Sequence, residues 1–84
     1  MHHPTWQLYG TLGCHLCEQA EQLLQQFADH RAFQLHVVDI AMLPEPEMNA
    51  LATQIPVLST QQHRLNWPFS LADMMQAYQA EHLT

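Results

Sequence analysis

Basic residues are scarce in this chain of 84 residues: it has no lysine and only two arginines, against eight acidic residues, for a net charge of −6. Proteins that bind nucleic acid neutralise the phosphate backbone with lysine and arginine, so this charge balance excludes nucleic-acid binding as a main function. Anionic membrane surfaces attract the same residue types, which disfavours binding to a membrane surface. The sequence therefore predicts neither a nucleic-acid nor a membrane partner.

Long apolar runs are missing too, and none approaches the roughly 20 residues that a membrane-spanning helix needs. Residues Met1 to Pro4 contain no basic segment followed by an apolar stretch, so no secretory signal is predicted and we expect a cytoplasmic protein. Apolar residues make up 48% of the chain, which is ordinary for a folded protein. The length fits a single small domain over residues 1–84, which we expect to be a monomer.

Cysteine is also scarce, and the two cysteines present, Cys14 and Cys17, are three positions apart. A disulfide that closes so short a loop constrains little of the chain, so a purely structural role explains the pair poorly. A reactive dithiol or half of a metal site explains it better. A structural zinc site usually needs four ligands, and here no second cysteine pair exists and the histidines are scattered. The residues therefore argue against a bound metal.

The surroundings of the two cysteines indicate a strand followed by a helix. Thr5–Tyr9 is rich in strand-forming residues, and the glycines of residues 10–13 interrupt that pattern. From about His15 to Asp29, apolar residues recur at the spacing of one helix face. Cys14 is thus expected at the helix start and Cys17 inside the first turn.

That placement has a chemical consequence for Cys14. The first backbone N–H groups of a helix have no partner within the helix, and they stabilise a thiolate by hydrogen bonding and by the positive end of the helix dipole. Both effects lower the pKa of a thiol, and the thiolate is the nucleophile of disulfide exchange. We therefore predict that Cys14 attacks a disulfide and that Cys17, more buried, resolves the mixed disulfide.

The rest of the chain predicts a compact α/β unit. The order of elements is β-α-β-α-β-β-α, and the first strand, helix and second strand form a βαβ unit with parallel strands. The elements expected after the first helix are a strand over Phe33–Val38, a helix opening near Pro46, a strand over Ile55–Leu58, an edge strand over His63–Asn66 and a helix from Ser70 to His82.

Four segments in this order carry a resemblance to a known family. They are residues 8–17 with the C-x-x-C pair, Val38-Asp39-Ile40, Ile55-Pro56-Val57-Leu58 and Trp67-Pro68-Phe69. The chain resembles the thioredoxin fold, and it is similar to a group of small bacterial glutaredoxin-like proteins. The resemblance implies a four-stranded mixed sheet flanked by three helices, and a thiol–disulfide oxidoreductase that acts on a small-molecule or protein substrate.

The resemblance also assigns a role to Ile55 and Pro56. In this fold the matching proline is cis and lies beside the cysteine pair, so Ile55-Pro56 is expected to be a cis bond that positions the substrate. The backbone of Ile55 would then pair with an extended substrate segment. The residues alone would favour a trans bond, because cis is the minority state even before proline.

Other residues depart from the glutaredoxin pattern. Typical glutaredoxins carry a basic residue just before the motif and a Gly-Gly pair after the last strand, both of which hold glutathione. This chain has residues 10–13 (Gly-Thr-Leu-Gly) and 66–70 (Asn-Trp-Pro-Phe-Ser) at those places. Glutathione carries net negative charge, which a protein of net charge −6 does not attract. No bound cofactor is expected, and a protein or other thiol becomes a better candidate reductant than glutathione as co-substrate.

Two questions stay open at this level. His15 lies between the cysteines, where it could stabilise the Cys14 thiolate as a protonated imidazole or simply extend into solvent. Two other functions compete with the oxidoreductase: a non-catalytic thioredoxin-fold module for binding or redox sensing, and a metal or iron–sulfur carrier. Outside the motif, we expect His36 and His63 on strand surfaces, and Trp67 with Phe69 packing the last helix onto the sheet.

Overall fold

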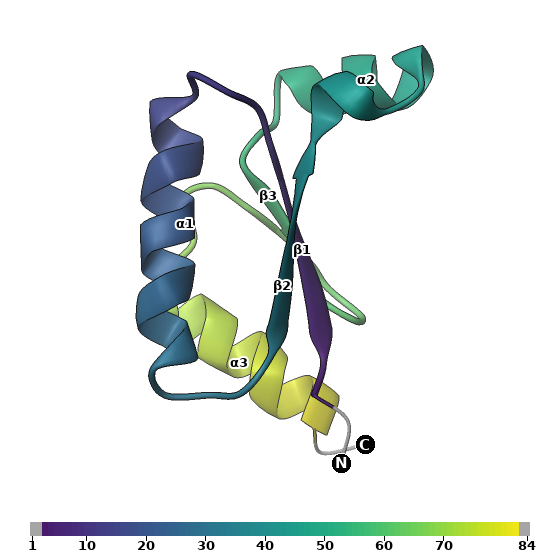
Figure 1. The fold of residues 1–84 in the computed structure, drawn as a ribbon. Coiled ribbons are helices and arrows are strands. Elements are labelled where there is room, and N and C mark those ends of the chain that lie inside the picture. The colour runs from purple at the N-terminus through teal and green to yellow at the C-terminus, as the bar shows by residue number, and fades with distance from the viewer. Residues whose placement is uncertain (1–2, 83–84) are drawn as a thin grey trace.

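The fold is a four-stranded sheet with helices on both faces, seen in a computed structural model that describes residues 3–82 (Figure 1). Met1 and His2, on which the prediction about a secretory signal partly rested, lie outside this range. The elements in chain order are β1 (Thr5–Gly10), α1 (His15–Ala28), β2 (Gln34–Asp39), a 3₁₀ turn η1 (Ile40–Met42), α2 (Glu45–Ala52), β3 (Val57–Ser59), β4 (Arg64–Asn66) and α3 (Leu71–His82).

The sheet is mixed, with strand order β2-β1-β3-β4. β1 and β2 are parallel and are joined by α1, whereas β3 is antiparallel to β1 and β4 is antiparallel to β3. The predicted order of elements and the predicted mixed sheet are both confirmed. Because β1 and β2 are parallel, the loops that follow both strands lie at the same end of the sheet.

One face of the sheet packs against α1 and α3. Trp6 and Leu8 of β1 point to this face, where the rings of Trp6 and Phe27 stack with centroids 5.5 Å apart. The buried members of this cluster are Trp6, Leu8, Ala20, Leu24, Phe27, Leu58, Phe69 and Met74. Burying apolar side chains from β1, α1, β3 and α3 together stabilises both helices on this face.

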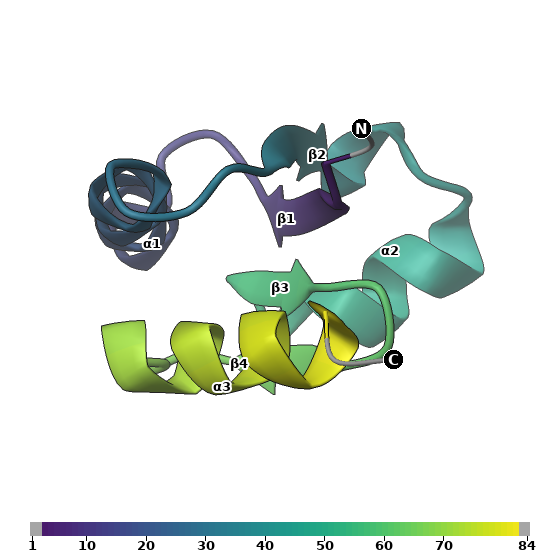
Figure 2. The ribbon, with the colours of Figure 1, turned by 90° about the horizontal axis from the view of Figure 1, so that it is seen from below.

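The other face of the sheet carries a smaller cluster beneath α2. Ile40, Leu51 and Val57 are buried there, with Tyr9 and Ile55 packed against them. Seen from below, α1 and α2 lie on opposite sides of the strands (Figure 2). Neighbouring residues of one strand therefore serve different clusters, as the period of two along a strand requires.

The segment between β4 and α3 leads into the last helix. Ser70 and Asp73 form a capping box, in which each backbone N–H donates to the other residue's side chain, at 2.9 and 3.0 Å. Phe69 is buried in the main cluster, and Trp67 packs against it with ring centroids 5.1 Å apart. The prediction that this pair packs the last helix onto the sheet is confirmed.

The expected starts of β2 and β3 need correction, and one short element was not expected. β2 begins at Gln34 rather than Phe33, whose ring turns inward to lie 4.9 Å from the ring of Trp6. β3 begins after the proline, at Val57, and η1 was not foreseen. η1 forms because the Asp39 carboxylate accepts a hydrogen bond from the Ala41 N–H at 3.0 Å.

The expectation for His63 is wrong. β4 begins at Arg64, and His63 lies in the turn before it, with its Nδ1 2.7 Å from Oε2 of Glu81 near the end of α3. The Glu81 carboxylate is buried and holds the turn through the Thr60 hydroxyl and the N–H groups of Gln61 and Gln62. The alternation of apolar and polar residues that indicates a strand cannot predict this turn, because the carboxylate that holds it comes from a distant helix.

None of the helices within residues 3–82 combines the length and the apolar character that crossing a lipid bilayer requires.

Candidate active site

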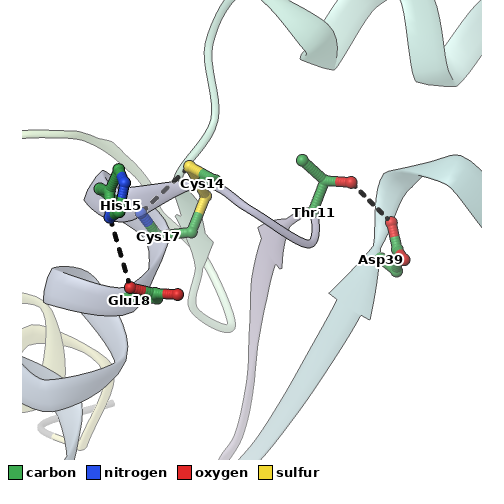
Figure 3. The surroundings of a disulfide bond; sticks show 6 residues. All are labelled: Thr11, Cys14, His15, Cys17, Glu18 and Asp39. Carbon is green, nitrogen blue, oxygen red and sulfur yellow. Dashed lines mark hydrogen bonds and ion pairs between the residues drawn. A yellow bond between two sulfur atoms is a disulfide. The ribbon is translucent and has the colours of Figure 1, made fainter.

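The two cysteines lie at the junction between β1 and α1. Cys14 and Cys17 form a disulfide, with their Cα atoms 5.2 Å apart (Figure 3). Between β1 and the disulfide the chain turns through Gly13, whose φ of 77° lies in the left-handed region that glycine adopts without steric cost. This turn reverses the chain so that Cys14 can open the helix.

Cys14 is the N-cap residue of α1. Its backbone is extended, with φ −93° and ψ 105°, and its Sγ accepts a hydrogen bond from the Cys17 N–H at 3.1 Å. An N-cap side chain normally supplies an oxygen to this N–H group, and here a sulfur takes that place. The predicted location of Cys14 at the helix start is confirmed, and its side chain is partly exposed.

Cys17 lies one turn further into the helix and is buried, with 6% of its surface exposed. Its side chain packs directly against the backbone of Gly10, the last residue of β1. The two cysteines therefore differ in exposure: Cys14 is half-buried, whereas Cys17 is buried. This difference is the one that the sequence predicted for the two thiols.

Ile55 and Pro56 lie at the same end of the sheet as the cysteines. The bond between them is cis, as expected, and Pro56 is buried. Tyr9 pairs with Val57, so continuing the antiparallel register by one residue places Pro56 opposite Gly10. The Ile55 N–H is already bonded to the Leu51 carbonyl at 3.1 Å.

His15 extends away from the protein, with 90% of its side chain exposed. Its Nδ1 lies 3.6 Å from Oε2 of Glu18, toward which the ring points (Figure 3). The imidazole therefore has a carboxylate beside it as well as the neighbouring Cys14.

The loop before the disulfide is tied to the neighbouring strand. The Thr11 hydroxyl donates a hydrogen bond to the Asp39 carboxylate at 3.2 Å, across the parallel strands β1 and β2 (Figure 3). Asp39 also caps η1, so one carboxylate links the cysteine loop to the segment that follows β2. The sequence analysis did not predict this link. Its only indication in the sequence was the acidic residue Asp39 at the end of a predicted apolar strand.

A comparison with protein families shows to which family this domain belongs. The model of the family described as glutaredoxin-like domain (DUF836) matches residues 5–83. The chain belongs to this glutaredoxin-like family. Its C-x-x-C pair and cis proline thus occur in a domain of the family that the sequence motifs indicated.

A solved structure supports the fold of this glutaredoxin-like domain. An X-ray structure of a structural genomics target protein from X. campestris, XcR50, is similar, with a TM-score of 0.69 and 32% sequence identity. The similarity covers 89% of this chain and 96% of the other. Among curated proteins, no match was found.

Within residues 3–82 of this glutaredoxin-like domain, no three side chains of histidine, cysteine, aspartate or glutamate are grouped so that they could hold a metal ion.

Proposed function

We propose that this domain is a thiol–disulfide oxidoreductase in which Cys14 attacks and Cys17 resolves. The observation that carries the proposal is the hydrogen bond of 3.1 Å from the Cys17 N–H to Cys14 Sγ at the start of α1. In the reduced protein the same N–H group would face a thiolate, and a hydrogen bond to the charged form lowers the pKa of a thiol. Cys14 is thus the better nucleophile of the pair.

The reaction transfers two electrons to a substrate disulfide. The Cys14 thiolate attacks one sulfur of the substrate, forming a mixed disulfide and expelling the other half as a thiolate, which takes up a proton from water. The Cys17 thiol then loses its proton, and its thiolate attacks Cys14 Sγ, which releases the second half of the substrate as a thiol. The protein dithiol ends as the disulfide, and the substrate disulfide as two thiols.

Ile55 is the proposed contact for the backbone of the substrate. Its N–H is occupied by the Leu51 carbonyl, so substrate pairing would use the Ile55 carbonyl as an acceptor for a substrate N–H. The cis bond to Pro56 turns the chain here, at the end of the sheet that carries Gly10 and the disulfide. This pairing suits an extended peptide, which offers N–H donors.

The proposed reductant is a protein dithiol or another thiol, with glutathione the less favoured co-substrate. Arg31 follows α1 at the end opposite the disulfide, and the guanidinium of Arg64 stands over the Tyr9 ring at 5.9 Å. The charged side chains that line the groove next to the cysteine loop are the carboxylates of Glu18, Glu21 and Asp39. A glutathione carboxylate would meet like charge there.

Cysteine variants test the proposal directly. Reduced wild-type protein is expected to reduce a mixed-disulfide peptide; Cys14→Ser should abolish this reaction, and Cys17→Ser should accumulate a covalent adduct visible by mass spectrometry. A redox titration against glutathione and against a dithiol buffer then identifies the preferred partner. Full turnover by both variants would overturn the assigned roles, and a Cys14 that alkylates slowly at pH 7 would favour a non-catalytic binding or redox-sensing module.

A further inference from the structure

A groove runs beside the disulfide on the side away from Ile55 and Pro56. It has a volume of about 200 Å³ and lies between the first turns of α1 and the end of β2, reaching Cys17 and Gly13, the residue before Cys14. Its walls are largely apolar, from Leu8, Leu12 and Val37. A substrate residue next to the cysteine that bonds to Cys14 would therefore lie at the mouth of this groove.

Two of these apolar side chains are unusually exposed. Leu12 is 91% exposed and Val37 is 55% exposed, whereas most large apolar side chains of the described residues are buried in the two clusters or packed against them. Exposed apolar surface that lines a groove is a common feature of binding sites.

The charged groups that line the groove are all carboxylates. They belong to Glu18, Glu21 and Asp39. Neither Arg31 nor Arg64 lines it. The groove thus combines an apolar wall with a negatively charged rim.

We propose that this groove holds a lysine or arginine side chain of a protein substrate, next to the cysteine that Cys14 attacks. The proposal rests on the proposed function. The aliphatic stem of lysine or arginine can lie along Leu12 and Val37 while its cationic head meets the carboxylates, which is how such side chains distribute themselves between apolar and polar surroundings. The groove volume suits one long side chain.

Charge complementarity separates this occupant from the alternatives. Glutathione carries net negative charge, so the carboxylates of the rim would repel it. A second copy of this chain, with a net charge of −6, would be repelled for the same reason. A neutral apolar side chain would contact Leu12 and Val37 but would bring no positive charge to the three carboxylates of the rim. Only a cationic side chain with an apolar stem complements both parts of the groove.

The test uses three synthetic peptides whose single cysteine is activated as a mixed disulfide with 2-thiopyridine. The cysteine is flanked on both sides by lysine, by norleucine or by glutamate. Attack by Cys14 releases 2-thiopyridone, which is followed by absorbance, so no reductant is needed once the protein has been reduced and desalted. Rates are divided by those of the same peptides with dithiothreitol, which removes differences in intrinsic reactivity.

We expect the rate order lysine, norleucine, glutamate, with a lysine-to-norleucine ratio of about three to ten at low salt that falls as salt is added. The double variant Glu18→Gln/Glu21→Gln should lower this ratio by about two- to fivefold, as expected for partly exposed charge pairs. Glu45→Gln, which removes an exposed carboxylate of α2 outside the groove, should leave the ratio unchanged.

The outcomes separate the two proposals. If all three peptides react at Cys14 but the ratio is near one, or is the same in wild type and the double variant, the groove proposal fails and the oxidoreductase proposal stands. If none of the peptides reacts faster with wild type than with Cys14→Ser, the oxidoreductase proposal itself fails, and the groove proposal with it.

Discussion

The backbone of Gly10 and the side chain of Cys17 are in direct contact. A Cβ atom added to Gly10 would lie 3.0 Å from Cys17 Sγ and 3.2 Å from Cys17 Cβ, closer than side chains normally approach. Gly10 ends β1 and Cys17 belongs to the first turn of α1, so this contact sets how closely the helix carrying the disulfide approaches the sheet. Glycine is needed here for the space, not for its backbone freedom, because its φ is not positive.

Gly10→Ala is therefore expected to lower the free energy of unfolding by about 1–3 kcal/mol, because the added methyl group overpacks the contact with Cys17. Denaturant unfolding of the oxidised protein measures this. In a Cys17→Ala background the sulfur is absent, so the cost of Gly10→Ala should shrink. An equal cost in both backgrounds would show that the contact with Cys17 is not the cause.

Glu81 should make the stability depend on pH. Burial raises the pKa of Glu81, but hydrogen bonds from His63, Thr60 and the backbone N–H groups of Gln61 and Gln62 outweigh it, so the pKa lies below its usual value of 4.5. A carboxyl group with a lowered pKa stabilises the fold fully above its unfolded pKa, and this contribution is lost as the pH falls through the folded pKa.

Glu81→Gln is accordingly expected to cost about 1–3 kcal/mol near neutral pH, because the buried Thr60 hydroxyl and the partly buried donors of the turn lose a charged acceptor. The difference from wild type should narrow as the solution is acidified below about pH 4.5, which urea unfolding at a series of pH values measures. Glu45→Gln makes the same charge change on an exposed residue and should stay within about 0.5 kcal/mol of wild type. A difference for Glu81→Gln that does not vary with pH would argue against this account.

His15→Ala tests whether the imidazole acts on Cys14. The ring is 90% exposed and has the Glu18 carboxylate 3.6 Å away. A positive charge at so exposed a position would interact only weakly with a neighbouring thiolate, so removing the imidazole should raise the pKa of the Cys14 thiol only slightly. The rate of alkylation against pH, measured in Cys17→Ser to isolate one thiol, gives this value. Identical curves with and without the imidazole would assign His15 no role.

Phe69→Ala should be among the most destabilising substitutions at the end of the sheet. Phe69 is 5% exposed and packs in the main cluster, so its truncation is expected to cost about 3–5 kcal/mol of unfolding free energy. Leu12→Ala, at a residue that is 91% exposed, should change stability by no more than about 0.5 kcal/mol. Thermal or denaturant unfolding compares the two, and similar losses would contradict the assigned burial.

Local patterns in the sequence were enough for the order of the elements and for the place of the cysteines. The helical spacing after His15 and the β-rich segment before Gly10 located the first strand and helix, since both signals depend only on nearby residues. The cis bond before Pro56 could be expected only from the family resemblance, and the second cis bond, between Trp67 and Pro68, was not expected at all. Whether an X-Pro bond is cis or trans depends on the residues that pack around it. Local sequence patterns do not show which residues those are.

Composition and local patterns are enough to predict a small acidic α/β domain with a C-x-x-C pair at a helix start, because charge, periodicity and spacing can be read directly from the order of residues. Which distant residues meet depends on the tertiary structure. It set Gly10 against Cys17, joined His63 to Glu81, and brought Leu12, Val37 and three carboxylates around one groove. Such contacts join residues far apart in the chain, and only the packing of helices on both faces of the sheet brings them together.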